Sequence, residues 1–168
     1  MENLPETVNT QSVALAIYNP TPGTKAIDIR RQMLQLPEVA KSLSGVEKYI
    51  FAASTKMQIA DIDDDTLIAK TGQMFRFIAM DVGYIIPTNP EDWAYICTRL
   101  LDILKKYYSQ MTLADIKLAF ELATTGELDD YLPKDSQGNP DKKHYQQFNA
   151  DYFAKILNAY RRKQNGVI

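Results

Sequence analysis

Residues 88–126 decide the fold, and they read TNPEDWAYICTRLLDILKKYYSQMTLADIKLAFELATTG. Asn89 followed by Pro90 is a strong helix start, because the asparagine side chain can accept a bond from a free backbone N–H and proline has no N–H to leave unpaired. Asp92, three residues after Asn89, completes a pattern that resembles a capping box. The stretch therefore predicts a helix that begins at Pro90.

The apolar residues of this first helix recur at helical spacing. An i, i+3, i+4 pattern sustained over about five turns predicts one face turned to the core. Lys105 and Lys106 follow in the last turn, where the helix dipole favours cations. The apolar stripe consists of Trp93, Ile96, Cys97, Leu100, Leu101, Leu104 and Tyr107.

A second helix begins three residues after the first ends, so the two form a hairpin or a sharply angled pair. Thr112 and Asp115 have the spacing of a capping box, and Met111 and Ile116 have the spacing of a hydrophobic staple across it. Gly126 is expected to end this helix in the left-handed conformation that glycine adopts without steric cost.

The composition is that of an ordinary globular domain with a slight negative charge. The chain has 168 residues, 45% of them apolar, and a formal net charge of −2, so it can bury a sizeable core and is not a general polyanion binder. The single cysteine, Cys97, excludes an internal disulfide and a cysteine-based zinc site, and is expected to be a small buried hydrophobe. An acidic N-terminus and the absence of a run of about 18 apolar residues favour a cytoplasmic protein without membrane contact.

The chain divides into an N-terminal arm, residues 1–24, and a helical domain, residues 25–168. The arm holds one apolar run, Val13 to Tyr18, which suits either a short strand or a docked helical turn. Such a run packs on its own domain or on a neighbouring subunit, so a homo-oligomer formed through the arm is one expectation. The fold class we predict is all-α, a single compact domain of six or seven helices.

The remaining helices are predicted from shorter signals. Residues 25–59 suit two or three helical pieces, with Pro37 restarting a helix and Met57 on an apolar stripe. Residues 66–82 are apolar on more than one side, Ile68 included, which is typical of a central helix buried by several neighbours. Residues 129–147 are polar and are expected to form a long loop.

The cluster Asp61 to Asp65 is the densest group of acidic residues. Its Asp-x-Asp-x-Asp spacing resembles the start of a calcium loop, but Thr66 and Gly72 occupy the positions where that loop needs glycine and glutamate. A helix start capped by Asp64 or Asp65 is the main interpretation. A magnesium or catalytic carboxylate site is the alternative.

Sequence patterns for catalysis are missing. The chain has no phosphate-binding loop, no dinucleotide fingerprint, no nucleophile elbow and no His-Glu-x-x-His motif. The single histidine, His144, lies in the polar loop without a second histidine or cysteine to share a metal. We therefore expect a protein that is not an enzyme and uses no cofactor or metal.

The last helix is expected to begin at Asn149, with Phe148 and Phe153 as a staple and a polar end at residues 164–166. Its apolar face predicts docking on the core, and its basic end suits its own dipole. An alternative is a nucleic-acid surface, with cations for phosphates and tyrosines for base stacking. The candidate residues are Lys155, Arg161, Arg162 and Lys163 with Tyr152 and Tyr160.

Two runs, residues 111–128 and 145–162, resemble a pattern in small helical proteins of bacteriophages and mobile elements, some of which are suspected DNA-replication accessory factors such as helicase loaders. The resemblance covers the last third of the chain and rests on caps, staples and core positions. It implies a non-enzymatic accessory factor in phage or mobile-element DNA replication that binds a replication or host protein. Weak binding of single-stranded DNA is a second expectation, and it rests on the candidate residues of the last helix. The alternative is an inhibitor of a host protein, or a structural helical protein.

Overall fold

The computed structural model describes residues 23–168, which form seven α-helices and two short 3-10 helices. The predicted all-α class is confirmed, since these residues form no strand and only two isolated β-bridges. The expectations for the arm, including the run 13–18 and oligomer contacts through it, lie outside the described residues. The helices are α2 (Ala26–Leu34), α3 (Pro37–Ser42), α4 (Gly45–Ser54), η1 (Ile59–Asp61), α5 (Asp64–Asp81), α6 (Pro90–Tyr107), α7 (Leu113–Thr125), η2 (Asp129–Tyr131) and α8 (Ala150–Val167).

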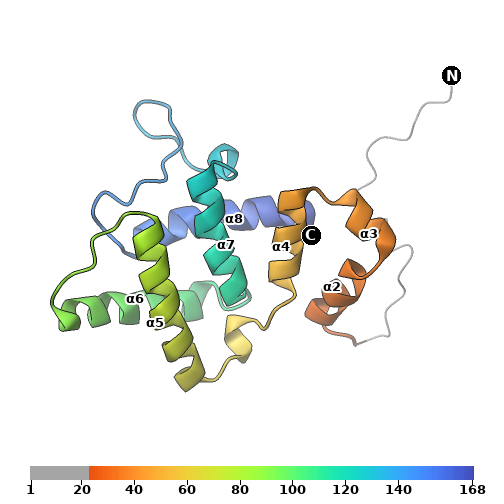
Figure 1. Cartoon of the computed structure of the whole chain (residues 1–168), viewed down its shortest axis with the longest axis horizontal. Helices are drawn as coiled ribbons and strands as arrows, with labels where there is room; N and C mark the ends of the chain where they lie inside the picture. The colour runs from red at the N-terminus through yellow and green to blue at the C-terminus, as the bar shows by residue number, and fades with distance from the viewer. Residues whose placement is uncertain (1–22) are drawn as a thin grey trace.

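Helix α7 lies in the middle of the molecule, where it contacts α4, α5 and α8 (Figure 1). Helix α8 also packs against α4 and α6, and α2 contacts α4 at one end of the molecule. Helices α5 and α7 lie side by side, and their N-to-C directions are parallel in space (Figure 1). This parallel pair matters for the candidate site.

The start of α6 is confirmed, and its end is corrected. Asn89 accepts a 3.0 Å bond from the Glu91 N–H, and Pro90 is the first helical residue. Among the described hydrogen bonds Asp92 makes none back to the cap, so the capping box predicted there is wrong. The stripe prediction is wrong at Tyr107, which is 64% exposed, because the helix ends there and the next residue, Tyr108, turns into the core.

Both ends of α7 match the prediction. The Thr112 hydroxyl accepts a 2.9 Å bond from the Asp115 N–H, and Asp115 accepts a 3.0 Å bond from the Thr112 N–H. Gly126 has φ of 87°, and the Glu127 N–H donates back to the Leu122 carbonyl at 2.9 Å. These are the bonds of a Schellman motif, which satisfies carbonyls left free at the helix end.

The helices before α5 begin at the residues with the strongest start signals. Pro37 opens α3, and Ser44 forms a reciprocal capping box with Glu47 at the start of α4. Helix α4 ends at Ser54, so Met57 lies beyond it and is 56% exposed. The prediction that placed Met57 on a buried stripe is therefore wrong.

Helix α5 differs from its prediction in two ways. Its N-cap is Asp63, one residue before the predicted position, and the Asp63 carboxylate accepts a 3.1 Å bond from the Thr66 N–H. The helix is packed on one side only, because Ile68 is 58%, Phe77 51% and Met80 66% exposed. The prediction of a central helix with Ile68 inside is wrong, and the exposed apolar residues need another explanation.

Helix α8 begins as predicted and ends later. Asn149 accepts a 3.1 Å bond from the Tyr152 N–H, and the staple residues Phe148 and Phe153 are buried with ring centroids 5.0 Å apart. The helix continues to Val167, through the polar residues expected to end it.

One hydrophobic core joins the helices. It contains Trp93, Leu100 and Leu104 of the stripe predicted for α6 and Phe153 of the staple predicted for α8, together with Phe120 of α7. No helix of the described chain is long and apolar enough to cross a bilayer.

Candidate functional site

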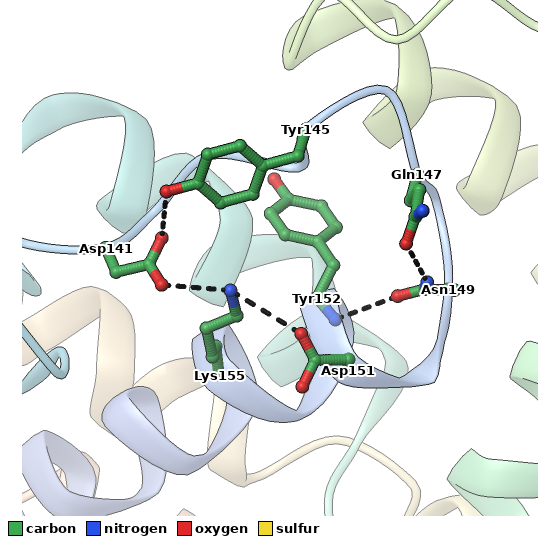
Figure 2. Close-up of polar contacts among 7 residues, drawn as sticks. All are labelled: Asp141, Tyr145, Gln147, Asn149, Asp151, Tyr152 and Lys155. Atoms are coloured by element: carbon green, nitrogen blue, oxygen red, sulfur yellow. Dashed lines mark hydrogen bonds and ion pairs between the residues drawn. The ribbon is translucent and has the colours of Figure 1, made fainter. Parts of the chain in front are cut away.

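The cations predicted to contact phosphates all lie on α8, and the structure gives each of them a partner in its own chain. The Lys155 side chain is 19% exposed, and its Nζ lies 3.1 Å from Asp141 and 3.5 Å from Asp151. Tyr145 donates a 3.2 Å bond to Asp141, so two loop residues close over α8 (Figure 2). Burial lowers the pKa of Lys155, but the two carboxylates outweigh it and raise its pKa overall. Lys155 therefore anchors the loop.

The three cations near the end of α8 diverge. The Arg161 guanidinium lies 5.3 Å over the Tyr108 ring, beyond the end of α6. Arg162 donates to the Tyr131 carbonyl oxygen, and the Lys163 ammonium lies 5.5 Å over the ring of the same tyrosine. These side chains are thus held by two different neighbours of α8, and they do not form one continuous basic patch.

The two tyrosines predicted to stack on bases are buried. Tyr152 is 3% exposed and packs among the rings of Phe120, Phe148 and Phe153. Tyr160 is fully buried and donates its hydroxyl to Asp115. Base stacking on the surface of α8 would therefore require both rings to leave the core, which corrects the geometry expected from the sequence.

The other candidate groups have structural roles in the described residues. The acidic cluster Asp61 to Asp65 supplies the cap and first turn of α5, and no three His, Cys, Asp or Glu side chains of the described chain are placed to hold a metal ion. Cys97 is half-buried, and burial raises the pKa of its thiol to about 11. That thiol is protonated at neutral pH and a poor nucleophile.

A groove of about 300 Å³ lies between α5 and α7. On α5 the lining residues recur at helical spacing over three turns, so they form one face of the helix. The α7 residues likewise share a face, which begins in its first turn. The lining consists of Lys70, Gln73, Met74, Phe77, Ile78 and Asp81 from α5 and Leu113, Ala114, Lys117, Phe120 and Glu121 from α7.

The floor of this groove is apolar, and charges stand along its rims in a definite order. Lys70 precedes Asp81 on α5 by three turns, about 16 Å at 1.5 Å per residue. Lys117 precedes Glu121 by one turn on α7, and the two helices run in the same direction (Figure 1). The groove is therefore basic toward one end and acidic toward the other. Phe77, half-exposed, forms its lip.

Sequence reasoning missed this groove although the signal was present. The sequence shows an excess of apolar residues around α5, and this excess predicts burial on several sides, whereas in the structure one side is exposed. The charged residues at Lys70 and Asp81 share a face with Phe77, which is the pattern of a helix that exposes an apolar face between charged rims. The sequence alone does not show the second wall, because α7 begins at Leu113, beyond the whole of α6.

Comparison with protein-family models, curated proteins and solved structures finds no match to this chain.

Proposed function

We propose that this protein is a non-enzymatic accessory factor that acts by binding a helix of a partner protein in the groove between α5 and α7. The observation that carries the proposal is the combination of an apolar floor with ordered charges on two parallel helices. Amphipathic helices bind such grooves through anchors at i, i+3 or i+4, and i+7. Phe77, which lines the groove and is 51% exposed, supplies apolar surface that a bound helix would cover.

The rim charges specify the chemistry of the partner. A helix that fits both ends would place acidic residues near Lys70 and Lys117 and basic residues near Asp81 and Glu121. Complementary rim charges favour the correct partner and speed its association, whereas the apolar floor supplies most of the binding energy. Binding should consequently weaken with salt without being abolished by it.

The process in which this protein acts is proposed from the resemblance of residues 111–128 and 145–162. It would be DNA replication in a phage or mobile element, with a replication or host protein as the partner. Direct contact with single-stranded DNA through α8 is not part of this proposal, because Lys155, Arg161, Arg162 and Lys163 have partners in their own chain.

Selection from a yeast-displayed library of helical peptides, each about four turns long, tests the groove with the full-length chain as bait. We expect enrichment of peptides that combine an apolar stripe with acidic residues toward one end and basic residues toward the other. Their binding should be lost with Phe77→Lys, which places a charge on the lip. It should be retained with Tyr95→Lys, which changes an aromatic residue of α6 that is 68% exposed and lies outside the groove lining.

Two outcomes would contradict the proposal. Enriched peptides that bind the Phe77→Lys variant as tightly as wild type would place the binding surface elsewhere. A wild-type dimer in sedimentation experiments that becomes monomeric with Phe77→Lys would show that a second copy of the chain occupies the groove in place of a partner.

A further inference from the structure

A second cavity, separate from the floor of the α5–α7 groove, lies beneath residues 142–146 of the polar loop. It has a volume of about 430 Å³ and is bounded by the C-terminal ends of α5 and α7 and the first turn of α8. This volume falls in the range of small-molecule sites. The groups that line it include Tyr152, His144, Tyr145, Lys142, Lys143 and Asp81.

The Tyr152 hydroxyl is an unused hydrogen-bond donor at this cavity. The residue is 3% exposed, and its hydroxyl oxygen reaches the solvent of the cavity, where it forms no hydrogen bond with any described residue. Figure 2 shows its ring rising from α8 toward Tyr145 with the hydroxyl at the tip and no dashed line on it. Because this hydroxyl opens onto the cavity and has no partner among the described residues, it can donate to an acceptor atom of a bound ligand. Burial raises the pKa of Tyr152 to about 12, which keeps the hydroxyl protonated.

The loop over the cavity is held in a costly conformation. Tyr145 has φ of 50° and Gln146 φ of 63°, a left-handed pair without glycine. His144 fixes them, because its Nδ1 accepts a 3.1 Å bond from the Gln146 N–H while Nε2 lies 3.2 Å from the Val82 carbonyl oxygen. The carbonyl is an acceptor only, so Nε2 carries the proton. Strained backbone held this way is concentrated at ligand sites.

The charges select the ligand. Lys142 pairs with Asp129 at 3.0 Å, whereas Lys143 is exposed and has no ion pair among the described residues. An anionic group at the cavity mouth would therefore meet Lys143. Asp81 is the one acid in the lining of this cavity as described, and its carboxylate can accept hydrogen bonds from hydroxyl groups.

We propose that this cavity binds a nucleoside monophosphate, either free or as the phosphorylated end of a single strand. The phosphate lies at Lys143, the base lies against the His144 and Tyr145 rings, and an acceptor atom of the base receives the Tyr152 hydroxyl proton. A sugar hydroxyl donates to Asp81. This site is independent of the α5–α7 groove apart from Asp81, which lines both.

Titration of the full-length chain with AMP, followed by calorimetry and saturation-transfer NMR, tests the site. AMP should bind saturably in the millimolar range or below, and Tyr152→Phe should weaken it about 3- to 10-fold, the value of one hydrogen bond. Lys143→Ala should weaken the binding of AMP but leave the affinity for adenosine, which has no phosphate, unchanged. Tyr95→Phe and Lys48→Ala, exposed residues on other helices, are the matched controls and should bind as wild type.

Thermal melting shows whether a loss of AMP binding in a variant reflects the site itself or a loss of folded protein. Tyr152→Phe should melt at or above the wild-type temperature, because the hydroxyl has no internal partner to lose. A 5′-phosphorylated trinucleotide that displaces AMP assigns the site to a strand end, and one that does not displace AMP assigns it to the free nucleotide. No saturable AMP binding, unchanged AMP affinity in Tyr152→Phe, or inorganic phosphate binding as tightly as AMP would overturn the proposal.

Discussion

The Tyr160 hydroxyl donates a 2.8 Å hydrogen bond to Oδ1 of Asp115, and both residues are buried in the contact between α8 and α7. Gln164 donates a second bond to the same oxygen at 3.0 Å, while Oδ2 accepts the Thr112 N–H. The Thr112 hydroxyl in turn donates to the Ala53 carbonyl of α4 at 2.8 Å. The Asp115 carboxylate thereby links the cap of α7 to α8, and the Thr112 hydroxyl links the same cap to α4.

Tyr160→Phe should lower the free energy of unfolding by about 1–3 kcal/mol, because it removes a donor from a buried carboxylate. Urea denaturation followed by circular dichroism measures the loss. Tyr95→Phe removes a hydroxyl from a tyrosine that is 68% exposed and should change stability by less than about 0.5 kcal/mol. Equal stability of wild type and Tyr160→Phe would mean that this bond contributes nothing net.

The pH dependence of stability should report Asp115. Burial raises the pKa of Asp115 in the folded state, against the opposing hydrogen bonds from Thr112 and Tyr160. The Asp115 carboxyl therefore holds its proton more tightly in the folded state than in the unfolded state, where the pKa of an aspartate is about 3.9. Stability from this group is lowest above the folded pKa and rises as the pH falls toward the unfolded value.

Comparison with Asp115→Asn isolates the contribution of Asp115 to the pH dependence of stability, because asparagine does not titrate and the other acidic residues are common to both proteins. The free energy of unfolding of wild type minus that of Asp115→Asn should increase as the pH falls from neutral toward 4. Urea melts across this range measure the difference. A difference that shrinks on acidification would show that the hydrogen bonds to the carboxylate outweigh its burial.

Local signals predicted the parts of the fold that depend on neighbouring residues. The caps at Asn89, Thr112 and Asn149 were readable because each needs only a side chain and a backbone N–H within three residues. The bond between Tyr160 and Asp115 was not readable, since it joins residues 45 positions apart. Periodicity placed Tyr160 on the apolar face of its helix, yet its aromatic character also suggested a surface role that its burial contradicts.

The two candidate sites fell outside prediction for a related reason. The sequence contained every residue of the groove wall on α5, but the position of α7 beside it is a property of the whole packing. The polar loop was predicted as a loop, whereas its left-handed residues Tyr145 and Gln146 are non-glycine and give no sequence signal. Their conformation depends on His144 bonding to Val82, 62 residues away.

Two glycines should respond to alanine in opposite ways. Gly126→Ala should cost about 1–2 kcal/mol, because its φ of 87° is left-handed and disfavours any side chain. Gly72→Ala should stabilise by about 0.5–1 kcal/mol, because it lies inside α5, has no heavy atom within 4 Å of the added carbon and loses entropy as glycine. Thermal melts of both variants measure the signs. The same sign at both positions would contradict the conformational argument.

Leu100→Ala should cost about 2–5 kcal/mol, because Leu100 is 1% exposed in the common core. Tyr107→Ala, on the same helix but 64% exposed, is the control and should cost less than about 0.5 kcal/mol. Guanidinium denaturation of both variants measures the difference. If Leu100→Ala costs less than about 0.5 kcal/mol, the α6 stripe does not pack as described.

Two ion pairs in this protein have nearly the same N–O distance but different exposure, so they test how burial changes the strength of an ion pair. Lys155 lies 3.1 Å from Asp141 with both side chains 19% exposed, and Lys105 lies 3.0 Å from Asp64 with side chains 48% and 76% exposed. A double-mutant cycle with Lys155→Met and Asp141→Asn should give a coupling energy of about 1 kcal/mol or more. The exposed pair, with Lys105→Met and Asp64→Asn, should give about 0–0.5 kcal/mol.

The double-mutant cycles also separate the coupling energy of each ion pair from the other interactions of its two residues. Lys155 has a second partner in Asp151, and Asp64 lies in the first turn of α5, but each cycle subtracts what the single variants change on their own. Raising the salt to about 1 M, where charges are screened within roughly 3 Å, should remove the coupling of the exposed pair and leave most of the coupling between Lys155 and Asp141. Asp141→Asn keeps an acceptor for the Tyr145 hydroxyl, so the loop stays closed during the measurement. Equal coupling energies for the two pairs, or equal loss with salt, would show that Lys155 does not hold the loop to α8 by its charge.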